Sequence, residues 1–141
     1  MVYLIRKENG KTQILLQQRA GKDYNAEGLW EASAAGHVDP GESMTATAIR
    51  ETKEEIDVKF SEKDIEFTTI IHSNQYEVPY YNGHFFVNKF SGKPRICEPN
   101  KCSNLRWYDL DKLPENFFAD RREAIQNFIK KKGYSEIGWK D

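Results

Sequence analysis

Residues 36–58 read GHVDPGESMTATAIRETKEEIDV. The stretch begins with a turn signal, because Pro40-Gly41 breaks regular structure and lets the backbone bend sharply. Helix-compatible sequence follows from Ser43, whose hydroxyl can accept a hydrogen bond from an unpaired amide of the first turn. No Gly or Pro interrupts the chain until well past Val58. The pattern therefore predicts a sharp turn followed by one long helix.

Three carboxylates fall on one face of this expected helix. A helix turns about 100° per residue, so Glu51, Glu54 and Glu55 lie together. Like charges at this spacing destabilise a helix by about 0.2–0.5 kcal/mol per pair, so their retention indicates a use for concentrated negative charge. Mg²⁺ and Mn²⁺ prefer such oxygen ligands, whereas a solvated acidic surface is the alternative interpretation. The side expected to be buried carries Thr45, Ala48, Ile49, Thr52 and Ile56.

The spacing of the charged residues in this stretch carries a family resemblance. Gly36, Glu42, Arg50-Glu51 and Glu54-Glu55 are separated by five, seven and two residues, so six residues stand at set spacings across twenty positions. This pattern resembles the signature of the Nudix hydrolases. One departure is Asp57, which stands where that family usually has Gly and which is expected to alter the C-terminal cap of the helix.

The Nudix resemblance implies an α/β fold, an α/β/α sandwich with a mixed sheet. It also implies Mg²⁺-dependent (or Mn²⁺-dependent) hydrolysis of a diphosphate linkage in a nucleoside diphosphate derivative. The metal ion would neutralise phosphate charge and activate a water molecule. The implied metal ligands are Gly36, Glu51, Glu54 and Glu55, with Glu54 or Glu55 as the catalytic base. Arg50 would hold the neighbouring carboxylates by a bidentate pair, and the alternative for Arg50 is a surface ion pair.

A second block, Glu98-Pro99-Asn100-Lys101-Cys102, resembles a segment found in nucleoside triphosphate diphosphatase-like members of the family. The resemblance implies that Glu98 faces the catalytic helix as a further metal ligand or base, and that Lys101 lies near phosphate oxygens. The alternative is a solvent-exposed loop.

Substrate contacts are the least determined part of the expected site. Recognition of a base needs a stacking or apolar surface. The aromatic candidates by position are Trp30, Tyr76, Tyr80, Tyr81, Phe85 and Phe86. Trp30 and Tyr81 are selected from them, although most aromatics of a small domain belong to its core. Arg19 is the candidate for a contact with phosphate. In the alternative interpretation, its guanidinium group extends into solvent and contacts no substrate.

The reaction favoured by these features converts a (d)NTP or modified nucleotide to NMP and pyrophosphate. ADP-ribose, dinucleoside polyphosphates and sugar nucleotides stay open as substrates. A non-catalytic nucleotide sensor is a further alternative, but such domains generally lose signature carboxylates that this chain keeps. Residues 29–37 look somewhat like the approach to the motif in isopentenyl-diphosphate isomerases. Those enzymes need a cysteine there, and Cys97 and Cys102 lie far downstream.

Length and composition limit the partners. The 141 residues are expected to form one domain, residues 1–141, and a net charge of −1 with a pI of about 6.3 gives no reason to expect nucleic-acid polymers or membranes as partners. No apolar run approaches the ~18 residues of a membrane span, and the two cysteines are expected to be free thiols. We therefore expect a cytoplasmic protein with a small-molecule nucleotide substrate; a homodimer stays open.

Apolar periodicity predicts the remaining elements. Asn9-Gly10 is a hairpin turn, residues 20–29 are a loop, and the last helix is expected to bury Ala124, Ile125, Phe128 and Ile129. Expected strands span residues 2–5, 13–19, 29–34, 58–60, 65–72, 84–90 and 104–108, and expected helices span 43–58 and 120–131, with a helical turn at 109–114.

Overall fold

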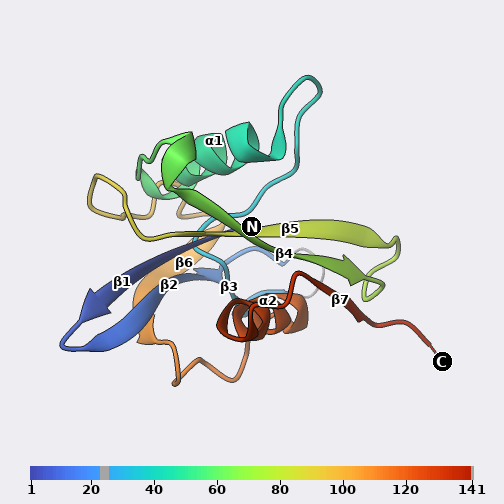
Figure 1. Cartoon of the computed structure of the whole chain (residues 1–141). Coiled ribbons are helices and arrows are strands. Elements are labelled where there is room, and N and C mark those ends of the chain that lie inside the picture. The colour runs from blue at the N-terminus through green and yellow to red at the C-terminus, as the bar shows by residue number, and fades with distance from the viewer. Residues whose placement is uncertain (23–25, 141) are drawn as a thin grey trace.

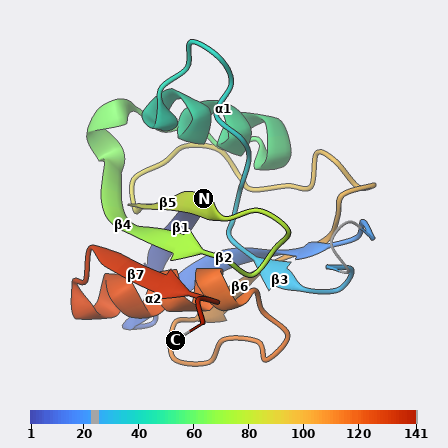
Figure 2. The ribbon, with the colours of Figure 1, turned by 90° about the vertical axis from the view of Figure 1, so that its right-hand side faces the viewer.

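The computed structural model describes residues 1–22 and 26–140. A mixed sheet lies between two helices, α1 (Met44–Ile56) on one face and α2 (Ala119–Lys130) on the other, as both views show (Figures 1 and 2). The strands are β1 (Val2–Glu8), β2 (Lys11–Arg19), β3 (Trp30–Glu31), β4 (Ile65–Ser73), β5 (Tyr80–Val87), β6 (Cys102–Asp109) and β7 (Tyr134–Ile137), and η2 (Glu62–Asp64) is a short 3-10 helix. The expected α/β/α sandwich with a mixed sheet is confirmed.

The sheet runs in the order β3-β2-β1-β5-β4-β7, and β6 pairs with β2. Strands β1 and β5 are parallel, as are β4 and β7, whereas the remaining pairs are antiparallel. The β1–β2 turn has Asn9 at φ 51° and Gly10 at φ 77°. Positive φ at both positions matches the twist of a two-residue hairpin, which confirms the turn predicted from Asn-Gly.

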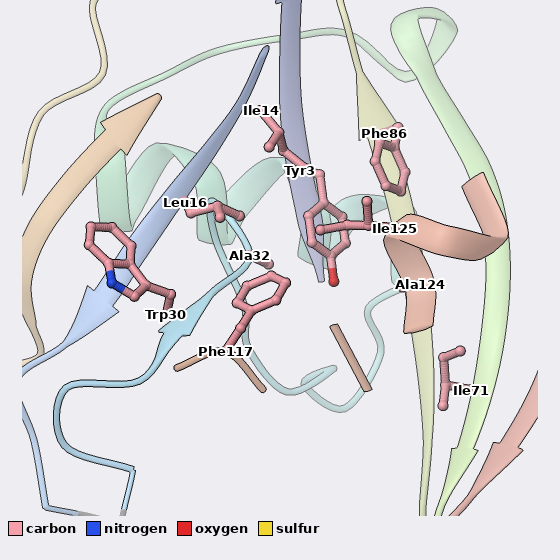
Figure 3. Packing of buried hydrophobic residues seen from close by; sticks show 10 residues of the cluster. All are labelled: Tyr3, Ile14, Leu16, Trp30, Ala32, Ile71, Phe86, Phe117, Ala124 and Ile125. Atoms are coloured by element: carbon pink, nitrogen blue, oxygen red, sulfur yellow. The ribbon is translucent and has the colours of Figure 1, made fainter. Parts of the chain in front are cut away.

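Side chains that alternate along the strands build a separate core on each face of the sheet. In β1, Tyr3 points into the cluster beneath α2, while Val2 and Leu4 point into the cluster beneath α1. Figure 3 shows the first cluster, where Tyr3 lies beside Ile125 of α2. Successive strand residues face opposite sides, and each large buried side chain contributes about 1.5–3 kcal/mol. The sheet is therefore held rigidly from both sides.

Helix α1 begins and ends close to its predicted limits. The Ser43 side chain accepts from the Ala46 amide at 3.1 Å, which confirms the predicted cap. The helix ends at Asp57, which adopts the left-handed conformation at φ 58° although it is not glycine. The buried residues of the helix are Thr47, Ala48, Thr52 and Ile56. Ala48, Thr52 and Ile56 were predicted to be buried. Thr47 was not predicted, and Thr45 and Ile49 are only partly buried.

Several elements differ from the sequence-based expectation. Strand β7 was not predicted, because it is short and polar and exists through its parallel pairing with β4. Residues 58–60 form only a bridge between Lys59 and Ser91. Residues 109–114 form a hydrogen-bonded turn without a helix.

Smaller differences concern boundaries and exposure. Strand β5 begins at Tyr80, earlier than predicted, and β3 is limited to two residues. Ile129 of α2 is 58% exposed, so its predicted burial is wrong. Part of the expected loop at 20–29, residues 23–25, lies outside the described residues. No helix in the described ranges is long and apolar enough to cross a membrane.

Candidate active site

The loop before α1 passes directly over the acidic face of the helix. A Cβ atom built on Gly36 would lie 2.2 Å from both Cδ and Oε1 of Glu51. Real Cβ atoms do not approach other atoms so closely, so only glycine allows the backbone to lie against this carboxyl group. The backbone of Gly36 and the Glu51 carboxylate are thereby brought together, as the metal-site prediction requires.

Arg50 forms hydrogen bonds with three of the signature carboxylates. Its Nε and Nη2 donate to the two oxygens of Glu42 at 2.7 and 2.9 Å. Its Nη1 donates to Glu51 at 2.8 Å and to Glu54 at 3.3 Å. The hydrogen bonds from Arg50, with one from Thr47, lower the pKa of Glu42 to about 2. The bidentate pair of Arg50 is thus made with Glu42, and single bonds restrain the two helix carboxylates.

Glu55 lies in the most enclosed part of the acidic face. Its Oε2 accepts from the backbone amide of Ala35 at 2.8 Å. Burial, together with the negative charges of Glu31, Glu51 and Glu98, raises the pKa of Glu55 to about 8. Burial also raises the pKa of Glu51, although Arg50 opposes this. Burial and the neighbouring carboxylates therefore disfavour the charged form of Glu55 until a cation offsets them.

The loop between β5 and β6 brings Glu98 to the same region. The Cys97 amide donates to the Glu55 carbonyl at 3.1 Å, and the Arg95 amide donates to the Ile56 carbonyl at 3.0 Å. These bonds attach the loop to the C-terminal end of α1. Two segments about forty residues apart in the chain are thereby joined, and the charge of Glu98 acts on both Glu51 and Glu55.

These residues fit a hard divalent cation by the chemistry of their donors. The carboxylates of Glu51, Glu54, Glu55 and Glu98 supply oxygen atoms of the kind that Mg²⁺ and Mn²⁺ prefer, and a bound cation would relieve their mutual repulsion. Within residues 1–22 and 26–140, no three acidic, His or Cys side chains already converge into a ready metal cluster. Arg50 Nη1 binds Glu51 and Glu54, and the Ala35 amide binds Glu55.

Two predicted phosphate contacts are paired with carboxylates. Arg19 donates from Nη1 to Glu31 at 3.0 Å, with an Arg19 side chain that is 26% exposed. Lys101 lies 3.4 Å from Glu98 and is largely exposed. Lys101 therefore sits beside the acidic face, whereas Arg19 belongs to a neighbouring buried network.

The two aromatic candidates lie elsewhere. Trp30 is only 5% exposed and packs edge-on against Tyr108 at 5.0 Å, within the core under α2. Tyr81 is 70% exposed and stacks on His72 at 4.1 Å. The ring that meets the signature loop is Tyr80, whose centroid is 6.2 Å from that of His37. The structure thus does not bring Trp30 and Tyr81 together with the acidic face.

A buried ionic network next to Glu55 was not predicted from the sequence. Glu31, 1% exposed, accepts from Arg19 and from Nη2 of Arg121 at 3.2 Å. Arg121 also binds the fully buried Asp120 at 2.7 and 2.8 Å. The one available signal was a charged residue, Glu31, within an apolar strand. Breaking such a pair leaves an uncompensated buried charge, so the network fixes how β2, β3 and α2 meet.

The cysteines are closer to the acidic helix in space than in sequence. The Cys97 thiol contacts the carbonyl of Arg95 at 3.8 Å, and the backbone amides of both residues donate to carbonyls at the end of α1. Cys102 is buried, and burial raises the pKa of its thiol, which disfavours the reactive thiolate. Both thiols are free.

Comparisons with known proteins place these features in a family. A model of the NUDIX domain matches residues 1–128. Isopentenyl-diphosphate Delta-isomerase 2 of Photorhabdus laumondii is 32% identical over 108 residues, which are 74% of this chain and 59% of that protein. NAD-capped RNA hydrolase NudC of Stutzerimonas stutzeri is 30% identical over 98 residues, 70% of this chain and 33% of NudC. The chain thus spans less than two thirds of the length of these curated relatives.

Solved structures agree with the domain match. A MutT Nudix hydrolase from Burkholderia pseudomallei is 25% identical, with a TM-score of 0.72 over 89% of this chain and 95% of that one. The Nudix domain of Shewanella oneidensis NrtR, solved with ADP ribose, has a TM-score of 0.74 over 92% of this chain and 84% of that one; at 19% identity the likeness shows the fold alone. With the signature loop against the acidic helix and a domain match over most of its length, the chain belongs to the Nudix family.

Proposed function

We propose that the chain hydrolyses a diphosphate linkage in a nucleoside diphosphate derivative, and that it converts a (d)NTP or modified nucleotide to NMP and pyrophosphate. The observation that carries the proposal is the arrangement around Arg50, which restrains Glu51 and Glu54 beside the enclosed Glu55 and under the Gly36 loop. A polyphosphate would be repelled by these carboxylates unless a divalent cation lay between them. The acidic face is therefore suited to substrates that arrive with Mg²⁺.

Each side chain of the site takes a role that follows from its position. Glu51, Glu54, Glu55 and the Gly36 carbonyl would hold Mg²⁺, or Mn²⁺ in its place. When bound, the ion supplies charge neutralisation at the phosphate oxygens and lowers the pKa of a water molecule. Glu54, whose side chain is 56% exposed, can also reach a water and accept its proton. Arg50 positions the carboxylates without touching the substrate.

Two further residues complete the proposed site. Glu98, held near α1 by the Cys97 and Arg95 amides, would serve as a fourth carboxylate or as the base. Lys101, 3.4 Å from Glu98, would contact phosphate oxygens. Its exposed ammonium can turn between the two, since lysine is a flexible point charge.

The base of the nucleotide is proposed to stack near the signature loop. Tyr80 lies edge-on to His37, and Tyr76 lies 6.4 Å from Tyr80. Aromatic faces of this kind bind a planar heterocycle, and the contact of Tyr80 with His37 brings that ring to the signature loop. ADP-ribose, sugar nucleotides and dinucleoside polyphosphates remain alternative substrates. The NrtR domain solved with ADP ribose and an Ap4A hydrolase of C. elegans share the fold of this chain, at 19% and 24% identity.

Isomerase activity is the second candidate, because several of the curated relatives are isopentenyl-diphosphate isomerases. The position of Cys97 beside the end of α1 is the feature that favours it. Against it stands the absence of cysteine from residues 29–37, where those enzymes carry their catalytic thiol. The hydrolase proposal is therefore preferred.

A product-release screen tests the proposal. Purified protein with Mg²⁺ would meet canonical and oxidised nucleoside triphosphates, ADP-ribose, dinucleoside polyphosphates, sugar nucleotides and isopentenyl diphosphate. Pyrophosphate release from a triphosphate is expected, with loss of turnover in Glu55→Gln and full turnover in the control Glu66→Gln, which changes an exposed carboxylate of β4. Turnover that survives Glu55→Gln would refute the site. Conversion of isopentenyl diphosphate that stops in Cys97→Ser would replace the proposal with isomerisation.

A further inference from the structure

A cavity of about 480 Å³ lies away from the acidic face, between β1, β2, β6 and the loop that follows β5. Its floor is Leu15, Leu105 and Trp107, and the loop residues Phe90 and Pro94 form a wall. Small-molecule sites usually measure about 300–1,000 Å³ and combine an apolar lining with a few polar groups. None of the signature carboxylates lines this cavity, so it is separate from the candidate active site.

A cation, the guanidinium group of Arg6, is held over the floor of the cavity. The guanidinium carbon of Arg6 lies 4.1 Å from the centre of the Trp107 ring, and Phe90 stacks near the same ring at 6.4 Å and 18°. Arg6 Nε donates to Gln13 at 2.9 Å, and Gln13 in turn donates to Asp109 at 3.1 Å. Because Arg6 and Gln13 are cross-strand partners in the β1–β2 hairpin, the guanidinium is held over the ring by the sheet itself.

Two cations line the cavity without an ion pair to any residue that the structure describes. Arg6 and Lys93 both line it, and in the described ranges neither has a carboxylate within 4.0 Å. Arg50, Arg95 and Arg121, in contrast, each bind at least one carboxylate. Two unpaired cations at the edge of an apolar and aromatic floor are complementary to a ligand that carries a negative group on a flat apolar body.

The wall of the cavity is anchored to the end of α1. The backbones of Ser91 and Lys59 exchange two hydrogen bonds, of 2.9 and 3.0 Å. Arg95 binds Asp57 at 3.1 Å, and Gly92, at φ +100°, lies so close to the Asp57 carbonyl that a Cβ would be 2.9 Å away. Asp57 stands where the Nudix signature usually has Gly, and its carboxylate is what holds Arg95. The cavity is therefore formed before a ligand arrives, which lowers the cost of ordering on binding.

We propose that this cavity is a second ligand site, and that it binds an amphipathic anion with a flat apolar body and one sulfonate, carboxylate or phosphate group. The body lies against Leu15, Leu105 and Trp107, and the negative group lies between Arg6 and Lys93. The proposal does not depend on the hydrolase activity, because no residue is shared with the acidic face.

Binding of 8-anilinonaphthalene-1-sulfonate to the full chain tests this site. The probe is followed by NMR of the ¹⁵N-labelled indoles, since the three tryptophans lie in different places. Trp30 is buried in the other core, and Trp139 is exposed near His72. We expect the Trp107 signal alone to shift saturably, with an affinity unchanged by Mg²⁺ or by Glu55→Gln.

Charge variants separate specific binding from general adhesion to apolar surface. Arg6→Gln and Lys93→Gln are each expected to weaken the sulfonate probe about two- to fivefold, the range of an exposed charge pair. The control Lys130→Gln, at the end of α2, is expected to have no effect, and the neutral probe N-phenyl-1-naphthylamine is expected to bind equally to all variants. A shift of the Trp139 signal instead, an affinity independent of both cations, or displacement of the probe by Mg²⁺ with a nucleotide would overturn the proposal.

Discussion

Replacing Gly36 by Ala gives the sharpest test of how the signature loop and the acidic helix work together. The new Cβ would be 2.2 Å from the Glu51 carboxyl carbon, whereas ordinary van der Waals contact begins at 3.4 Å, so the carboxyl group must retreat by about 1.2 Å. The atoms that meet the Cβ are the far end of a flexible side chain, so the fold can accommodate the change. The change therefore separates the geometry of the site from the stability of the fold.

Gly36→Ala is expected to lower kcat without lowering the stability of the fold. A displacement of about 1 Å at a catalytic group costs on the order of 100-fold in rate, so kcat is expected to fall by about that factor. Stability is expected to stay level or rise by about 0.4–1 kcal/mol, because alanine restricts the unfolded chain and Gly36 does not have a left-handed φ. The assay is Mg²⁺-dependent turnover of the substrate identified by the screen, with urea unfolding measured on the same preparation.

The matched control is Gly133→Ala, where nothing lies within 4 Å of the added carbon and φ is also not left-handed. This variant is expected to keep full turnover. If Gly36→Ala keeps turnover within about threefold of the parent, the close approach of loop and carboxylate has no catalytic use. If its activity falls only in step with unfolding, the argument from side-chain displacement is wrong.

Three other predictions test the buried layers. Trp30→Ala should cost about 3–5 kcal/mol of unfolding free energy because it empties a core position, while Trp30→Phe should leave KM unchanged; a raised KM would return Trp30 to the substrate site. Burial, with the positive charges of the N-terminal amine and Arg121, holds the pKa of His84 well below its usual value, and the Tyr3 hydroxyl lies 2.9 Å from its Nδ1. The unfolded chain binds this proton below about pH 6.5 and the folded chain does not, so stability should fall as pH drops from there, by up to about 1.4 kcal/mol per unit. Urea unfolding at pH 7, 6 and 5 should show a shallower loss in His84→Gln, and equal slopes would contradict the assignment. Asn127→Ala should lower the free energy of unfolding by about 1–3 kcal/mol, because it removes the hydrogen bonds that join α2 to β4 and β7. The urea midpoint measures this change. A loss below about 0.5 kcal/mol, which is less than the lower end of that range, would show that water replaces these bonds.

The parts of the fold that were predictable rest on local interactions. The Ser43 cap, the acidic face at Glu51, Glu54 and Glu55 and the Asn9-Gly10 turn depend on neighbours within a few residues, so they can be read from the chain. Strand β7 could not be, because four residues with little apolar character become a strand only when β4 offers its edge. The same reasoning explains why residues 58–60 form a bridge to Ser91 and not a strand.

The candidate site divides in the same way. The signature spacing was sufficient to select the carboxylates, Arg50 and Gly36 and to indicate the family. Which aromatic ring lies near the loop was not readable, because Trp30 and Tyr80 both fit a strand pattern and only the packing of α2 buries Trp30. The buried pairing of Glu31 with Arg121 joins residues ninety positions apart.

The sequence by itself determined the turn, the acidic helix and the family, because these depend on residue types at short fixed spacings. Only the tertiary structure decided that Arg50 takes Glu42 as its bidentate partner and that the loop of Glu98 is attached to the end of α1. It also decided that Arg6 and Lys93 border a cavity with no carboxylate partner among the residues that the structure describes. Those outcomes depend on how the strands are ordered and on which loops meet, and distances between remote residues are set by the packing of the whole sandwich.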